Sequence, residues 1–302
     1  HRAKPPSHTQ QCRATNPMMA TLFDYKGEIS WCPGCGGYKI LSSIKEALTE
    51  LGKRPEEVAM VSGIGQAAKM PHYVHCHCFN GLHGRALPAA TGIHASNPSL
   101  TVIAVGGDGD MYGEGGNHFL HTIRRNPNIA HLVCNNMIYG LTKGQASPTT
   151  PQGMKTPTQP NGSAPRPMNP LAVALAQGAS FVARGSAAEP ELTKNLIKAA
   201  ILHEGYALID IFQPCVSFNK INTWQWLQAQ TYKLDENQNC EDPLKAMALA
   251  TECDPYPLGI FYQEKNRPHF IQTQAAWQND PRPLFEREAP KEAVKDFINR
   301  LR

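Results

Sequence analysis

Short apolar runs alternate with amphipathic stretches along the first two thirds of the chain. The apolar runs are rich in β-branched side chains and therefore predict buried strands. We expect these strands at Glu57–Gly63, Thr101–Val105, Ala130–Cys134, Ser180–Ala183 and Ala207–Phe212. Segments with apolar residues at helical spacing predict helices at Tyr38–Leu51, His83–Ala95, Gly115–Arg125, Pro170–Gln177 and Glu189–His203. This alternation is typical of an α/β fold, here a doubly wound parallel sheet covered on both faces.

The remaining segments follow neither pattern. Residues 1–18 are polar and contain proline, and we expect a disordered leader outside the fold. Residues 19–232 then form one α/β domain. Residues 233–302 are polar without clear periodicity, which predicts a mostly irregular C-terminal tail that packs along the surface or against another subunit. The stretch from Tyr139 to Pro170 predicts a long loop. Loops of that length are usually functional or disordered, and we expect a lid or a partner-binding surface.

Composition narrows the class of protein. The chain has 302 residues, of which 41% are hydrophobic, so it can build a core. No apolar run approaches the ~20 residues that span a bilayer, and no secretory pattern is visible. The net charge of +4, without a basic stripe, argues against nucleic acid as a partner. Nine cysteines without the spacing of a disulfide scaffold indicate a reducing compartment, so we expect a cytoplasmic protein with some cysteines as metal ligands.

The stretch from Thr101 to Gly140 carries the clearest candidate chemistry. Its first strand ends in GGDGD, where glycines let backbone amides approach a ligand, and the helix that follows attracts negative charge at its amino end. Its second strand runs into Asn135-Asn136. Loops after neighbouring parallel strands share one crevice, so Asp108 and Asn136 could offer oxygen ligands to a hard cation. Magnesium bridging a diphosphate fits this pattern.

Two other interpretations of GGDGD are a solvated acidic turn and a calcium loop. The calcium loop is disfavoured because Tyr112 and Phe119 occupy places where an EF-hand needs oxygen ligands.

Two cysteine-containing segments also suggest metal or redox chemistry. Cys32-Pro33-Gly34-Cys35 predicts a tight loop that could be a redox dithiol, half of a zinc knuckle or half of an iron–sulfur site, and the pair alone does not decide. The run His75–Cys78 (HCHC) suggests zinc. Four adjacent residues cannot readily wrap one tetrahedral ion, so only one or two of them could be ligands.

Taken together, the motifs resemble those of one family. WCPGCG, SGIG, LHGRA, GGDGD, NNMIYGLTKGQASPT and QPC, in this order, resemble the thiamine diphosphate-binding β subunit of the 2-oxoacid:ferredoxin oxidoreductases. The resemblance implies a thiamine diphosphate-binding fold, with magnesium held by Asp108, Asn136 and the backbone carbonyl of Ile138. The residues that it places along the cofactor are Ile64, Gly65, Gln66, Ala67, Gly109, Asp110, Gly140 and Leu141.

The same resemblance implies the reaction and the partners. The rest of the site comes from a larger α subunit, and the enzyme oxidatively decarboxylates a 2-oxoacid onto coenzyme A. Electrons pass through one [4Fe-4S] cluster to an external ferredoxin. The glutamate that activates the aminopyrimidine belongs to the α subunit in this family, so we expect the single chain to be inactive.

The cluster ligands depart from the family pattern. The family's ligands map to Cys32, Cys35, the residue after SGIG and Cys215, but the residue after SGIG is Gln66. Amides are poor cluster ligands beside thiolates. We predict that Cys76 supplies the missing sulfur, as relatives with the same glutamine have a cysteine at that place, with Cys78 as second choice. The alternative is a three-cysteine cluster or none, and Cys134 is assigned to core packing.

The substrate is inferred from fewer residues. Lys69, in the context KMPH, resembles a lysine near the distal end of the substrate in relatives that accept 2-oxoglutarate, although it could be a plain surface lysine. His83 and Arg85 would contact cofactor or carboxylate, and Leu141 would pack against substrate or thiazolium.

We favour 2-oxoglutarate, with pyruvate as the alternative. A non-redox thiamine diphosphate decarboxylase would leave Cys32, Cys35 and Cys215 without a role, and a zinc-ribbon module would leave GDG and NN without one.

Overall fold

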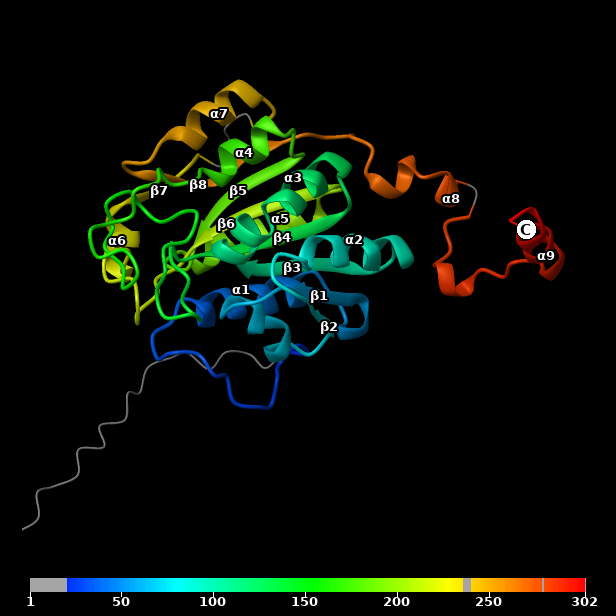
Figure 1. The fold of residues 1–302 in the computed structure, drawn as a ribbon, viewed down its shortest axis with the longest axis horizontal. Helices are drawn as coiled ribbons and strands as arrows, with labels where there is room; N and C mark the ends of the chain where they lie inside the picture. The colour runs from blue at the N-terminus through cyan, green and yellow to red at the C-terminus, as the bar shows by residue number, and fades with distance from the viewer. Residues whose placement is uncertain (1–20, 236–239, 279, 302) are drawn as a thin grey trace, which may run out of the picture.

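An eight-stranded sheet forms the centre of the molecule in the computed structural model (Figure 1), which describes residues 21–235, 240–278 and 280–301. The predicted leader, residues 1–18, lies outside the described residues. The strand order is β2-β1-β3-β4-β6-β5-β8-β7. The strands are β1 Val58–Ser62, β2 His77–Asn80, β3 Thr101–Gly107, β4 Ile129–Asn135, β5 Phe181–Ser186, β6 Tyr206–Phe212, β7 Thr231–Lys233 and β8 Tyr256–Gln263. Neighbouring strands are parallel except β5 and β8, which are antiparallel.

Helices cover both faces of the sheet, as predicted. The α-helices are α1 Gly37–Glu50, α2 Ala86–Ser96, α3 Gly116–Arg125, α4 Pro170–Ala176, α5 Pro190–Leu202, α6 Trp224–Ala229, α7 Pro243–Thr251, α8 Ala275–Gln278 and α9 Lys291–Arg300. Single turns of 3-10 helix occur at η1 Pro55–Glu57, η4 Phe270–Thr273 and η5 Leu284–Glu286, a longer one at η2 Ala67–Tyr73, and a π-helix at η3 Gly109–Glu114.

Two apolar layers form the core. One contains Ile40, Ile44 and Leu48 of α1 and Leu196 and Ile197 of α5. The other contains buried residues of α2, α3, α4 and α7, on the opposite face. The side chains of β1 point to the two layers in turn, because successive side chains of a strand lie on opposite faces of the sheet. All five predicted strands are confirmed, and each is almost wholly buried. Strands buried on both faces are mostly apolar, although β5 and β6 also carry the buried charges of Arg184 and Asp210.

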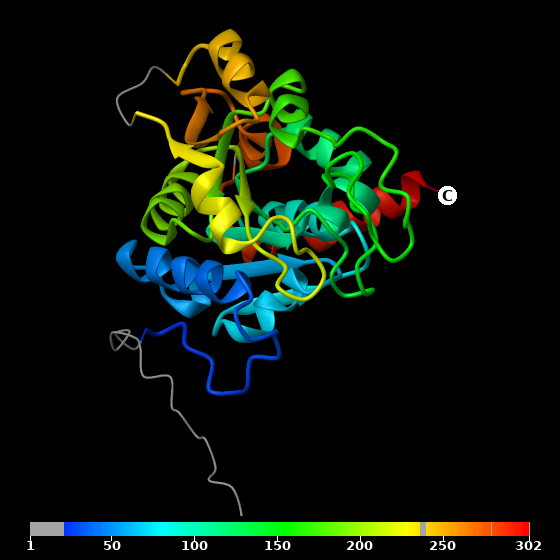
Figure 2. The ribbon, with the colours of Figure 1, turned by 90° about the vertical axis from the view of Figure 1, so that its left-hand side faces the viewer.

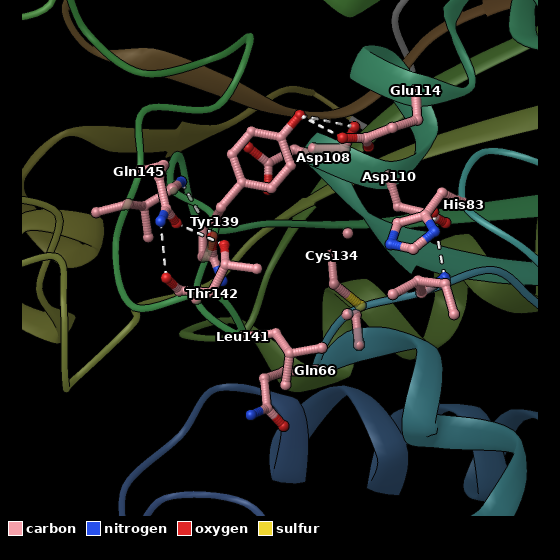
Figure 3. Close-up of a pocket in the computed structure, with 18 residues that line it drawn as sticks. Gln66, His83, Asp108, Asp110, Glu114, Cys134, Tyr139, Leu141, Thr142 and Gln145 are labelled. Carbon is pink, nitrogen blue, oxygen red and sulfur yellow. Dashed lines mark hydrogen bonds between the residues drawn. The ribbon is translucent and has the colours of Figure 1, made fainter. Parts of the chain in front are cut away.

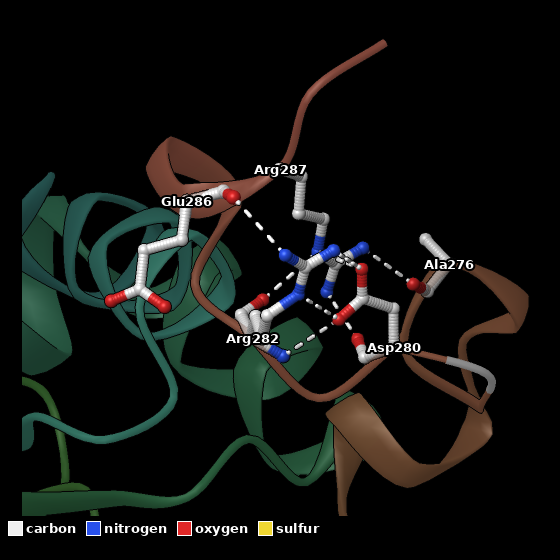
Figure 4. Close-up of polar contacts among 5 residues, drawn as sticks. All are labelled: Ala276, Asp280, Arg282, Glu286 and Arg287. Atoms are coloured by element: carbon white, nitrogen blue, oxygen red, sulfur yellow. Dashed lines mark hydrogen bonds and ion pairs between the residues drawn. The ribbon is translucent and has the colours of Figure 1, made fainter. Parts of the chain in front are cut away.

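The prediction of a mostly irregular tail is wrong for residues 243–263. These residues form α7 and β8, and β8 joins the sheet beside β5, so β6 is not the last core strand. Beyond β8 the chain folds locally. Arg282 and Arg287 both bind Asp280, and Arg287 also donates to the carbonyl of Ala276 at 2.6 Å (Figure 4). Helix α9 lies apart from the sheet in Figure 1.

The predicted loop, which begins at Tyr139, contains no helix or strand before α4 begins at Pro170. It lies beside the segment that follows β6, as Figure 2 shows, and Asn219 there donates to the carbonyl of Asn136 at 3.0 Å. No helix in the described ranges is long and apolar enough to cross a membrane.

Candidate functional site

A cavity of about 420 Å³ opens at the carboxyl ends of β1, β3 and β4 (Figure 3). Crevices at this edge of a parallel sheet commonly bind ligands. The structure brings together here every residue predicted along the cofactor and every predicted magnesium ligand. These residues are Ile64, Gly65, Gln66, Ala67, Asp108, Gly109, Asp110, Asn136, Ile138, Gly140 and Leu141.

Asp108 and Asn136 enter the cavity from the ends of two adjacent strands. Asp108 is 1% exposed, and its Oδ2 accepts a hydrogen bond from Thr149 Oγ1 at 2.7 Å. Burial raises the pKa of Asp108 from 3.8 to about 6. Asn136 Oδ1 accepts from the amide of Ile138 at 3.1 Å, which folds the loop into a tight turn. A carboxylate, an amide oxygen and a carbonyl are hard donors that suit Mg²⁺.

This donor set differs from a cluster of ionisable ligands. Within the described residues, no three or more His, Cys, Asp or Glu side chains are arranged to hold a metal ion. A magnesium site that takes most of its oxygens from a diphosphate and water needs no such cluster, so the residues present fit the group.

Asp110 ties together the three loops around the cavity. Its Oδ1 accepts from the amides of Ile64 at 3.2 Å and Gly84 at 2.8 Å. Burial raises the pKa of Asp110. Gly84 has φ +65°, and a Cβ there would lie 2.4 Å from the backbone of Glu114, so only glycine fits. The loops at Ile64 and Gly84 are thereby fixed to the loop after β3.

Tyr139 closes one side of the cavity, and its role was not predicted. Its hydroxyl donates to Glu114 Oε1 at 3.1 Å, and a Cβ on Gly109 would lie 2.2 Å from its ring. Thr149 was also missed. It is the last residue of the quoted segment NNMIYGLTKGQASPT, but nothing in that segment shows that the loop folds back to place it at Asp108.

A second hollow shares a wall with the cavity and contains three of the four predicted cluster cysteines. Cys32, Cys35 and Cys215 line it. Burial raises the pKa of Cys35, and the nearby sulfurs of Cys215 and Cys32 raise it further. Gln66 lines both hollows, and its Oε1 is buried without a hydrogen-bond partner among the described residues. Cys134 packs in the core as predicted, and it too lines both hollows.

The structure does not bring Cys76 to the other three cysteines. β2 runs parallel to β1 with Ala59 opposite His77, so Cys76 lies at the amino ends of the strands, whereas Cys215 follows the carboxyl end of β6. Burial raises the pKa of Cys76 to about 11. The sequence does not show that Cys76 lies so far from Gln66 in space. The separation arises because η2 returns the chain to the amino end of β1, where β2 begins. Cys78 is exposed on β2.

The predicted substrate residues divide into two groups. His83 and Leu141 line the cavity. Lys69, on η2, and Arg85, just before α2, do not line it. Their predicted contacts with substrate or cofactor therefore stay predictions.

Two family descriptions match the chain. The thiamine pyrophosphate enzyme C-terminal TPP binding domain matches residues 59–211, which contain both loops of the predicted magnesium site. The C-terminal part of the pyruvate ferredoxin oxidoreductase beta subunit matches residues 215–288.

Relatives and solved structures agree with these matches. The chain is 43% identical to the 2-oxoacid:ferredoxin oxidoreductase 2, subunit beta, of Aeropyrum pernix, over 84% of this chain and 86% of the relative. It is 36% identical to the 2-oxoglutarate synthase subunit KorB of Archaeoglobus fulgidus, over 78% and 84%. A structure of 2-oxoglutarate:ferredoxin oxidoreductase from Magnetococcus marinus matches with a TM-score of 0.86 and 35% identity, covering 92% of this chain and 96% of that one. The chain therefore belongs to the 2-oxoacid:ferredoxin oxidoreductases, as a β subunit.

Proposed function

We propose that this chain, together with a larger α subunit, catalyses the coenzyme A-dependent oxidative decarboxylation of a 2-oxoacid, with 2-oxoglutarate as the favoured substrate. Electrons leave through a [4Fe-4S] cluster to a ferredoxin. The observation that carries the proposal is the shared wall between the two hollows. Asn136 and Gly140, which follow β4, line both the cavity and the hollow that contains three cysteines. A cofactor and an electron acceptor would therefore lie side by side.

The chain's own residues hold the cofactor. Asp108, the side chain of Asn136 and the carbonyl of Ile138 would bind Mg²⁺, and the backbone at Gly109 and Gly140 would lie against the diphosphate. When bound, thiamine diphosphate supplies the electron sink for decarboxylation. Leu141, which is 41% exposed at the cavity, would cover the reacting end and exclude water from it.

We propose Cys32, Cys35 and Cys215 as three of the cluster ligands. Cys76 remains our proposal for the fourth, and it requires the segment between η2 and β2 to move, since Cys76 lies at the other end of β1. All four cysteines are free thiols, which suits thiolate ligands and a cytoplasmic location.

The substrate proposal rests on relatives and on one lysine. Several relatives are named 2-oxoglutarate oxidoreductase or synthase, and the matching structure from Magnetococcus marinus has 2-oxoglutarate, coenzyme A and succinyl-CoA bound. Lys69 is our proposed partner for the second carboxylate of 2-oxoglutarate, and His83 would contact substrate or cofactor from the cavity wall.

The test is a dye-reduction assay on the complex of both subunits, purified without oxygen. We expect reduction of a viologen with 2-oxoglutarate and coenzyme A, a slower rate with pyruvate, and none when coenzyme A is omitted. Asp108→Ala should abolish the rate. Turnover by the single chain would contradict the need for an α subunit. Carbon dioxide release without dye reduction would contradict the proposed reaction and favour a non-redox decarboxylase.

A further inference from the structure

A buried polar network extends from the metal-binding loop across the sheet. Asp210 on β6 and Arg184 on β5 are direct neighbours in register and are 0% and 3% exposed. Arg184 Nε lies 3.7 Å from Asp210 Oδ2, and the guanidinium lies over the ring of Phe212 at 4.9 Å. A carboxylate so far from water must find its hydrogen-bond donors in the protein.

Two side chains donate to Asp210. Tyr112 Oη lies 3.0 Å from Oδ1, and Asn135 Nδ2 lies 3.1 Å from Oδ1 and 3.3 Å from Oδ2. Because a carboxylate only accepts hydrogen bonds, Asp210 determines which end of the Asn135 amide faces it. The amino group points to Asp210, and the oxygen points the other way.

The oxygen of Asn135 then organises the loop that carries the proposed magnesium ligands. It accepts from the amide of Met137 at 3.1 Å and lies 2.9 Å from Thr149 Oγ1, the same hydroxyl that donates to Asp108. Met137 has φ +57°, a left-handed conformation uncommon outside glycine. The hydrogen bond from Met137 to Asn135 holds this strained residue, which lies between Asn136 and Ile138.

We propose that Asp210, held by Arg184, is a positioning residue for magnesium and thiamine diphosphate. It acts by fixing the Asn135 amide, which in turn places Asn136, Ile138 and Asp108. Neither Asp210 nor Arg184 lines the cavity, so neither touches the cofactor. This inference rests on the proposed function, because it assumes that the cavity binds that pair.

The test replaces the carboxylate with its closest neutral analogue. Asp210→Asn places an amide against the amide of Asn135, which must turn over or lose a hydrogen bond. In the complex of both subunits, with thiamine diphosphate in excess, we measure the Mg²⁺ concentration that gives half-maximal cofactor binding by calorimetry. We expect it to rise about tenfold, the usual consequence of losing a hydrogen bond to a charged group.

A matched control separates positioning from general stability. Tyr206 and His131 form another buried hydrogen bond, at 2.6 Å, away from the metal loop. It joins β6 to β4, the two strands that also carry Asp210 and Asn135. Tyr206→Phe should lower the melting temperature and leave the half-saturating Mg²⁺ concentration within twofold of wild type. If Asp210→Asn behaves in the same way, Asp210 is only structural and the inference is overturned.

A milder variant serves if Asp210→Asn does not fold. Tyr112→Phe removes one donor to Asp210, and we expect a rise of about fivefold in half-saturating Mg²⁺. A change below twofold would overturn the inference. A wild-type complex that binds no magnesium and thiamine diphosphate would refute the proposed function itself, whereas equal binding by wild type and variants refutes only the role of Asp210.

Discussion

The stability of the metal-free protein should depend on pH through Asp108. Burial raises the pKa of this carboxyl from 3.8 to about 6, so folding favours its protonated form. A group whose pKa is raised by folding contributes stability that is fully present below its unfolded pKa and is lost as pH rises through its folded pKa. This change in pKa corresponds to about 3 kcal/mol at full ionisation, and to about 2 kcal/mol between pH 4.5 and 7.5.

The assay is urea unfolding of the complex in the presence of a chelator, compared with Asp108→Asn. The variant keeps the shape and cannot ionise at this position, so other titrating groups cancel in the difference. We expect wild type to lose about 2 kcal/mol relative to the variant between pH 4.5 and 7.5. Added Mg²⁺ and thiamine diphosphate should remove the loss for wild type only. Parallel pH profiles for the two proteins without metal would refute the reasoning.

Three further substitutions test the site. Gly109→Ala should weaken thiamine diphosphate binding at least tenfold, because its Cβ would lie 2.2 Å from the ring of Tyr139; an unchanged dissociation constant in calorimetry would contradict this. Lys69→Met should raise the KM for 2-oxoglutarate about tenfold and leave that for pyruvate unchanged, since only the first has a second carboxylate; equal KM changes would reject the assignment. Cys76→Ala should lower the iron content below four per chain and change the electron paramagnetic resonance spectrum of the reduced complex. Cys78→Ala, the matched control on the exposed strand, should change neither. An intact spectrum in Cys76→Ala would remove Cys76 from the ligand set.

The sequence predicts the buried centre of the sheet better than its edges. Strands β1, β3, β4, β5 and β6 are buried on both faces, so each contains a short apolar run that the sequence shows directly. β2 is exposed at all four residues and reads as polar loop. β8 is apolar, but it pairs antiparallel with β5, which lies far away in the sequence. The segments around β8 do not show the regular alternation of strand and helix that identified the other strands.

The residues of the candidate site also fall into those that the sequence predicts and those that it does not. Asp108 and Asn136 follow strands directly, so strand prediction alone places them at one edge. The roles of Thr149 and Asp210 depend on contacts between segments distant in sequence. Thr149 lies within a quoted motif that does not reveal its contact with Asp108, and no local pattern marks Asp210. The prediction for Cys76 came from the resemblance to relatives with the same glutamine, and the sequence did not show that η2 and β2 place this residue at the amino end of β1.

Charge explains why the site should take a cation. Asp108 and Asp210 are both buried, and both contribute negative charge to one network joined by Asn135 and Thr149. Arg184 lies beside Asp210, but in the described part of the chain no cationic side chain lies within salt-bridge distance of Asp108. One buried carboxylate is thus compensated and the other is not, and Asp210 raises the pKa of Asp108 in addition to burial. Below about pH 6 the protein can relieve this imbalance by protonating Asp108. At neutral pH, where the carboxyl group is mostly ionised, a divalent ion bound beside it would compensate the charge.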